Sequence, residues 1–175
     1  HKELTQALSS HGAWATQQLI KVLMAISHPS EPTLVVDSDT VLLRDKVWLS
    51  SGGRQLLYFR GYTNPRYQHY LRSWGVSEID DLRSFVTHHM LFQPEILNEA
   101  ISKTFRSTNP RALVSAIISS AQELGFPEFS MDYELYGNVL WARHRDAYQL
   151  DKYSNIGLPR PDDSTVLESA LTTLR

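Results

Sequence analysis

The chain has 175 residues, of which 42% are hydrophobic and 21% charged, and this composition is that of one ordinary folded domain. Its 17 basic and 19 acidic residues leave a net charge of -2, which gives no electrostatic footprint for nucleic acid or an anionic membrane. Cysteine is absent, which excludes disulfides, thiolate metal sites and cysteine nucleophiles and is compatible with a reducing cytoplasm. No stretch of the sequence approaches the length of a transmembrane helix.

The first half of the chain combines an amphipathic helix with short apolar strands. Over residues 14–26 apolar side chains recur at helical spacing, with Gln17, Gln18 and Lys21 between them. The same kind of pattern predicts strands at residues 33–36, 55–60 and 84–87. The first of these strands is fully apolar, which is typical of a strand that is covered on both faces.

Prolines mark the start of three helices further along the chain. Pro65, Pro94 and Pro110 each follow a polar residue, and proline is tolerated in the first helical turn. The first of these helices is expected to end at Gly75 and the third near Gly125. Further elements are predicted as a helix over 131–143, a short strand from residue 146, a loop over 155–163 and a closing helix over 165–174. No internal repeat or low-complexity tract is present, so residues 1–175 are expected to form one domain.

Two carboxylates at the end of the first strand are the most informative feature. Asp37 and Asp39 flank Ser38, between the apolar runs 34–36 and 41–43. Two anions so close together repel each other, so we expect a bend at Ser38 and a bound cation that both carboxylates share. Aspartate oxygens suit Mg²⁺ or Mn²⁺, which take other ligands from phosphates and water. A strand-end turn explains the same residues without a metal.

Histidines and a second acidic pair complete the set of candidate residues. His88 and His89 directly follow the third predicted strand, and ligand crevices in open α/β sheets form at strand ends. Asp132 and Glu134 lie in the first turn of the last long helix, where the helix dipole stabilises acids; either can alternatively serve as a general base in a cleft. His144 lies just past that helix and can complete a metal site with the two aspartates, since imidazole is an acceptable ligand for Mn²⁺.

The segment 37–42 resembles the first motif of haloacid-dehalogenase-type phosphatases. In that family the first aspartate is the nucleophile and the second an acid/base, which here implies Asp37 and Asp39 in those roles. The chemistry also needs a strand-end serine or threonine, a lysine and a further acidic pair after an apolar strand. Neither of the pairs at 80–81 and 162–163 follows such a strand, so the resemblance covers one motif only.

Four blocks together resemble metal-dependent glycosyltransferases of the GT-A fold. They are similar in particular to a little-characterised family of bacterial glycosyltransferase-like proteins linked to surface polysaccharides. The blocks are Gln17-Gln18-x-x-Lys21, Val36-Asp37-Ser38-Asp39-Thr40, Ser84-Phe85-Val86-Thr87-His88-His89-Met90 and Asp132-Tyr133-Glu134-Leu135-Tyr136-Gly137-Asn138. The resemblance implies an α/β fold with a mixed sheet flanked by helices. It also implies a nucleotide-sugar donor whose diphosphate is bridged by Mn²⁺ or Mg²⁺ held at Asp37 and Asp39.

The same resemblance implies roles for the remaining candidates. In an inverting transfer Glu134, or as second choice Asp132, is the base that deprotonates the acceptor hydroxyl. His144 is expected to bind the metal or a phosphate. The residues expected to contact substrate are Gln17, Lys21, Ser38, His88 and His89. The acceptor is expected to be a glycan or another hydroxyl compound, and the protein to be cytoplasmic or peripheral at the inner face of the membrane.

The chain departs from the GT-A pattern at its beginning. A GT-A domain normally has a long nucleotide-binding βαβ region before its DxD motif, whereas 36 residues precede Asp37 here, and His1 is not a natural start. We therefore expect the chain to be the DxD-containing and acceptor-side portion of such a domain, without its amino-terminal part. A non-catalytic carbohydrate-binding domain is the alternative that needs no donor-binding half.

Overall fold

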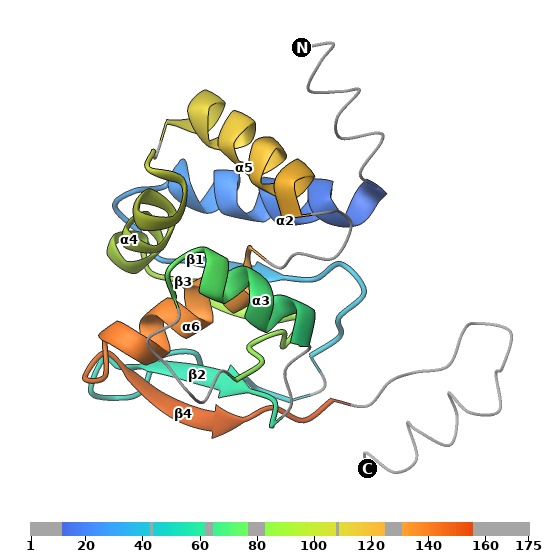
Figure 1. Cartoon of the computed structure of the whole chain (residues 1–175). Coiled ribbons are helices and arrows are strands. Elements are labelled where there is room, and N and C mark those ends of the chain that lie inside the picture. The colour runs from blue at the N-terminus through green and yellow to red at the C-terminus, as the bar shows by residue number, and fades with distance from the viewer. Residues whose placement is uncertain are drawn as a thin grey trace, which may run out of the picture.

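The computed structural model describes residues 12–42, 44–61, 65–76, 83–107, 109–124 and 131–155. Helices and strands are mixed along this part of the chain, so the α/β class expected from the sequence is confirmed (Figure 1). The elements in chain order are α2 (Gly12–Ile26), β1 (Thr33–Val36), β2 (Gln55–Phe59), α3 (Pro65–Ser73), β3 (His89–Phe92), α4 (Pro94–Phe105), α5 (Pro110–Leu124), α6 (Tyr133–Arg143) and β4 (Tyr148–Lys152).

The four described strands form two small sheets of different kinds. Strands β1 and β3 pair antiparallel, with Val36 opposite His89. Strands β2 and β4 pair parallel, with Gln55 opposite Tyr148. Within the described residues the two kinds of pairing therefore lie in separate sheets, which corrects the expectation of one mixed sheet.

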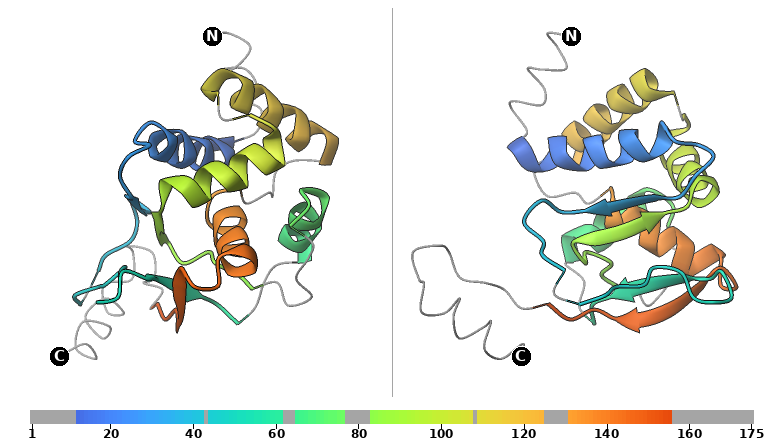
Figure 2. Two further views of the ribbon diagram at one scale, coloured as in Figure 1. Left: turned by 90° about the vertical axis from the view of Figure 1, so that its left-hand side faces the viewer. Right: turned by 180° about the vertical axis from the view of Figure 1, so that it is seen from behind.

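Helix α6 lies between the two sheets and forms the centre of the core (Figures 1 and 2). Its residues from Tyr133 to Leu140 are all buried. Tyr136 packs edge-to-face on Phe92 of β3, and Trp141 packs on Tyr148 of β4. Helices α2 and α5 lie on the far side of the β1–β3 sheet from α6. A helix buried all round is typical of a protein interior, and here it ties both sheets to one core.

Two of the predicted strands differ from the structure. The strand predicted at 84–87 is displaced, because Ser84 forms only an isolated bridge to Arg60 and β3 begins at His89. The residue before β3, His88, has φ 59, and this left-handed conformation interrupts the extended run. Strand β1 has the predicted bounds but is not covered on both faces, because Leu34 is 41% exposed and Val36 37%.

The other elements agree with the proline and glycine signals. Helices α3, α4 and α5 begin at Pro65, Pro94 and Pro110, as predicted. Gly75 follows α3 with φ 71, the conformation in which glycine commonly ends a helix. The closing helix predicted over 165–174 lies outside the described residues.

Gly137 of α6 permits a close approach of the segment before β3. A Cβ atom added at Gly137 would lie 2.4 Å from Cγ of Phe85, well inside van der Waals contact. Gly137→Ala is expected to lower the free energy of unfolding by about 1–3 kcal/mol, although alanine is the better helix former. Urea denaturation measures this change.

Gly61→Ala is the matched control for this substitution. A Cβ atom at Gly61 meets nothing within 4 Å, so its effect should stay within about 0.5 kcal/mol. Equal stability of Gly137→Ala and the unsubstituted protein would contradict the close packing of α6 against Phe85.

Candidate metal centre

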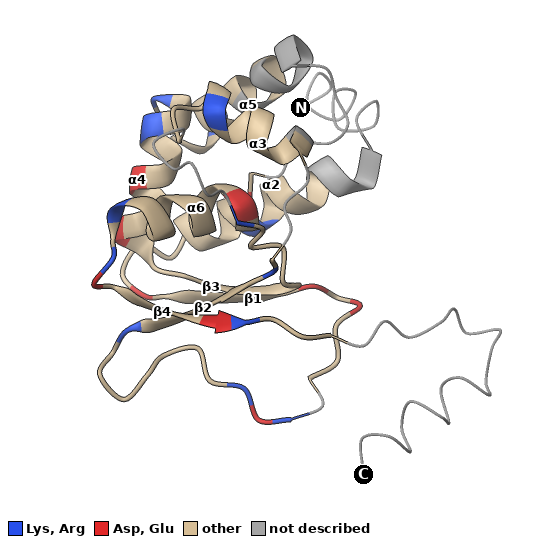
Figure 3. Cartoon of the chain, turned by 60° about the horizontal axis from the view of Figure 1, so that its bottom comes forward, with Lys and Arg blue, Asp and Glu red and all other residues tan. Residues whose placement is uncertain are grey.

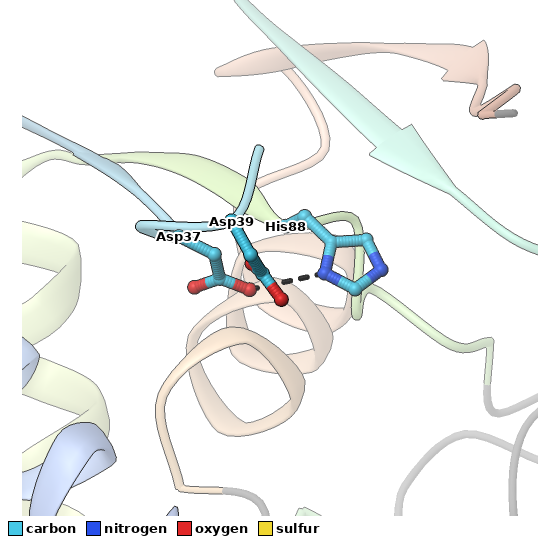
Figure 4. Close-up of side chains that lie close together, drawn as sticks. All are labelled: Asp37, Asp39 and His88. Atoms are coloured by element: carbon cyan, nitrogen blue, oxygen red, sulfur yellow. Dashed lines mark hydrogen bonds and ion pairs between the residues drawn. The ribbon is translucent and has the colours of Figure 1, made fainter. Parts of the chain in front are cut away.

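Two carboxylates and an imidazole come together where β1 ends (Figure 4). One ligand atom from each of Asp37, Asp39 and His88 lies within 4.8 Å of the others. The bend expected at Ser38 is present as a turn, in which the Thr40 N–H donates to the Asp37 carbonyl at 2.9 Å. The Asp37 N–H donates to the His88 carbonyl at 2.8 Å, which extends the β1–β3 pairing by one bond. Backbone geometry therefore delivers all three side chains to one place.

Asp37 is held on both of its carboxylate oxygens. Its Oδ1 lies 2.5 Å from Lys21 Nζ and accepts the Tyr133 hydroxyl at 2.7 Å. Its Oδ2 lies 3.1 Å from Nδ1 of His88. Burial acts to raise the pKa of Asp37, but the bonds from these three partners outweigh it and leave the pKa below its ordinary value. Asp37 is therefore ionised at neutral pH and oriented by its neighbours.

Lys21 joins Asp37 to a second acid from a distant part of the sequence. Its Nζ lies 3.1 Å from Oδ2 of Asp132, the N-cap of α6, and 4.4 Å from the ring centroid of Tyr133. Acidic positions in the loop after β1 and at the start of α6 are visible in Figure 3. Burial raises the pKa of Asp132, and Lys21 offsets part of this effect. With a side chain only 11% exposed, Lys21 is an internal counter-ion for these two acids, whereas the sequence indicated only a contact with substrate.

Glu134 lies in the interior of the protein and not in a cleft. Its side chain is 0% exposed, and Oε2 accepts the Phe85 N–H at 3.2 Å and the Asn138 side-chain amide at 3.1 Å. Burial raises the pKa of Glu134 to about 7. The expectation of a general base that points into a cleft is therefore corrected. Glu134 instead fastens the segment before β3 to α6.

Both of the other predicted histidines lie apart from this cluster. His89 is buried, and its Nδ1 accepts from Trp48 Nε1 at 3.2 Å. Burial lowers the pKa of His89 to about 4, so its ring is neutral at pH 7. His144 follows the far end of α6, a helix of 11 residues that is about 16 Å long, and lies 2.9 Å from Glu99. His144 is therefore not a ligand alongside Asp37, which corrects that part of the predicted metal set.

Other contributors to the site fall outside the predicted ligand set. Arg60, at the end of β2, places Nη2 3.3 Å from Nε2 of His88. Gln18 is buried, and its Oε1 accepts the Met131 N–H at 2.7 Å, next to the N-cap of α6. The sequence indicates the position of Arg60 at a strand end. No pattern in the sequence indicates that the side chain of Gln18 faces inward. The predicted substrate residues Gln17 and Ser38 are exposed.

Comparison with protein-family models, with curated proteins and with solved structures finds no significant match. The chemistry of the site therefore has to be argued from its own geometry. Among the helices in the described ranges, none combines the length and the apolar character needed to cross a membrane.

Removal of Lys21 would leave Asp37 and Asp132 nearly buried without their shared cation. Lys21→Met is expected to lower the free energy of unfolding by about 3–5 kcal/mol, as measured in urea. Lys103→Met is the control, because Lys103 has a 58% exposed side chain and pairs with Glu99 on the surface of α4. That exposed pair should contribute less than about 1 kcal/mol. Equal losses in the two variants would contradict the role of Lys21 as an internal counter-ion.

Glu134 should make stability depend on pH near neutrality. Its pKa rises from 4.5 to about 7 on folding, so between these values the folded chain binds more protons than the unfolded chain. Stability is therefore lost as the pH rises through this window, by about 3 kcal/mol in total. In Glu134→Gln this loss should be absent. Urea denaturation of both proteins at about pH 5 and about pH 8 should show that the free energy of unfolding shifts in favour of the variant at the higher pH. The same difference between the two proteins at both pH values would refute the raised pKa of Glu134.

Proposed function

We propose that the chain belongs to a metal-dependent glycosyltransferase of the GT-A class. It would transfer a sugar from a nucleotide-sugar donor to a hydroxyl group of a glycan or another acceptor, in surface polysaccharide synthesis. The observation that carries this proposal is the convergence of Asp37, Asp39 and His88 at the end of β1. Two carboxylates and one imidazole suit Mn²⁺ better than Mg²⁺, which prefers oxygen ligands alone.

The residues around this cluster fit a divalent cation. Lys21 and Tyr133 both hold Oδ1 of Asp37, so Oδ2, which faces His88 at 3.1 Å, is the oxygen that a cation shared with His88 would contact. Asp39 is exposed and His88 half-buried, so the cluster opens to solvent on their side. When bound, Mn²⁺ or Mg²⁺ would supply charge neutralisation for the leaving nucleoside diphosphate.

The acceptor base is assigned to Asp132 in this proposal. Both carboxylates are buried, and Asp132 is preferred because it shares Lys21 with Asp37 and so belongs to the network of the candidate centre. Burial raises the pKa of Asp132, which makes this carboxylate a better proton acceptor than an ordinary aspartate. Lys21 keeps Asp132 oriented through its 3.1 Å contact.

One observation supports the phosphatase alternative. A lysine beside the nucleophilic aspartate belongs to that chemistry, and Lys21 contacts Asp37. Both oxygens of Asp37 already have partners, however, which suits a carboxylate that holds a ligand better than one that attacks phosphorus. We therefore place the transferase first.

The test incubates the protein with a panel of nucleotide-sugars, with and without Mn²⁺. Metal-dependent binding and release of the nucleotide are the two quantities measured. Asp39→Asn should weaken Mn²⁺ binding at least about 10-fold, because it removes a charged ligand. Its folding stability should change by less than about 0.5 kcal/mol, since Asp39 is exposed. Asp45→Asn, an exposed carboxylate of the same loop, is the matched control and should leave Mn²⁺ affinity unchanged.

Two other outcomes would contradict the transferase. Phosphate release from small phosphate esters, with a covalent aspartyl-phosphate at Asp37, would support the phosphatase. Glycan binding that needs no metal, without affinity for nucleotides, would support a non-catalytic carbohydrate-binding domain.

A further inference from the structure

We propose that Lys46, Arg60 and Tyr153 form an anion-binding subsite beside the candidate metal centre, and that this subsite binds a diphosphate group. The proposal rests on the glycosyltransferase function only for the source of the diphosphate, a nucleotide-sugar. Strand topology, two cations without carboxylate partners and the contact of Arg60 with His88 support the subsite itself.

Strand topology places Arg60 and Tyr153 at the carboxyl end of the β2–β4 sheet. The two strands run parallel, and each of these residues directly follows its strand. The Tyr153 N–H donates to the Phe59 carbonyl at 2.9 Å, which fixes Tyr153 next to the end of β2. The carboxyl ends of parallel strands are where α/β proteins bind their ligands.

Two cations converge on the ring of Tyr153. The guanidinium carbon of Arg60 lies 5.3 Å from the ring centroid, and Nζ of Lys46 lies 5.9 Å from it. Lys46 also lies 3.6 Å from the ring centroid of Tyr58. Aromatic faces attract cations but leave their charge uncompensated. The rings therefore act as a platform that holds two positive charges near each other.

Neither cation has an acidic partner in the part of the chain that the structure describes. The ion pairs found there involve Lys21, His88, Lys103, Arg143 and His144. Burial lowers the pKa of Lys46, and the field of Asp151 offsets part of this effect without an ion pair between them. Two cations that share one ring, neither of them in an ion pair with a carboxylate of the described residues, favour the binding of an anion.

Arg60 connects this subsite to the metal centre. Its Nη2 lies 3.3 Å from Nε2 of His88, whose Nδ1 faces Asp37. A guanidinium has five N–H donors in a planar fork, of which the contact with His88 and a hydrogen bond to the Tyr153 side chain use two. The others suit a phosphate, which such a fork binds with two parallel bonds. An anion at Arg60 thus lies one imidazole ring away from Asp37 and Asp39, so one phosphate of a diphosphate would lie at Arg60 and the other at the cation that the two aspartates would hold.

The test measures pyrophosphate binding by isothermal titration calorimetry, with and without Mn²⁺. Arg60→Met and Lys46→Met should each weaken binding at least about 10-fold under both conditions, because each removes a charge-assisted contact. Arg60→Lys should recover part of the loss, since it restores the charge but not the fork. Lys103→Met is the control for a general change of charge and should bind as the unsubstituted protein does. Binding should weaken as NaCl rises from about 50 mM to about 300 mM.

Equal pyrophosphate affinity in Arg60→Met, Lys46→Met and the unsubstituted protein would overturn the subsite. A failure of the subsite and a failure of the proposed function give different experimental results. If the protein binds no Mn²⁺ but still binds pyrophosphate through Arg60 and Lys46, the metal centre is refuted and the subsite stands. If Mn²⁺ binds through Asp39 while neither cation matters, the subsite is refuted alone. Tighter binding of a nucleoside diphosphate than of pyrophosphate, with the same dependence on Arg60, would identify a nucleotide as the source.

Discussion

The arrangement of the candidate centre depends on one ion bridge, in which Lys21 of α2 contacts Asp37 after β1 and Asp132 before α6. The bridge joins three segments that are far apart in the sequence. Buried ion pairs add little net stability when compared with apolar packing, yet removal of one partner leaves an uncompensated charge. The bridge therefore matters mainly for which conformation is adopted. It joins α2 to the start of α6, and it occupies Oδ1 of Asp37 while Oδ2 faces His88.

Local signals in the sequence predicted those elements whose structure is decided locally. Proline at a first helical turn placed the starts of α4 and α5 correctly, and the apolar run at 33–36 placed β1. The strand before His89 was predicted too early, because β3 begins only after His88, whose left-handed backbone no local pattern indicates. Local patterns do not predict those helix and strand boundaries that depend on contacts between distant segments.

The candidate centre was predictable in part for the same reason. Asp37 and Asp39 were predicted as ligands from their position after a strand, whereas His88 was predicted to contact substrate. His88 in fact precedes β3 and reaches Asp37 because β3 pairs antiparallel with β1. His144 was included because it follows the helix that carries Asp132, but the length of α6 separates the two ends of that helix. Glu134 was expected to face a cleft, because its partners in the segment before β3 cannot be inferred from its own helix. Side-chain direction on a buried helix is a property of its surroundings.

The backbone at His88 restricts which residues can occupy that position. A φ of 59 is unfavourable for most side chains, and besides glycine it is tolerated best by asparagine, aspartate and histidine. Those three carry oxygen or nitrogen atoms that can bind a cation. The conformation thus favours, at position 88, residues that either keep a ligand atom or remove the side chain altogether. Arg106, with φ 54, shows that this preference is one of energy and not an exclusion of longer side chains.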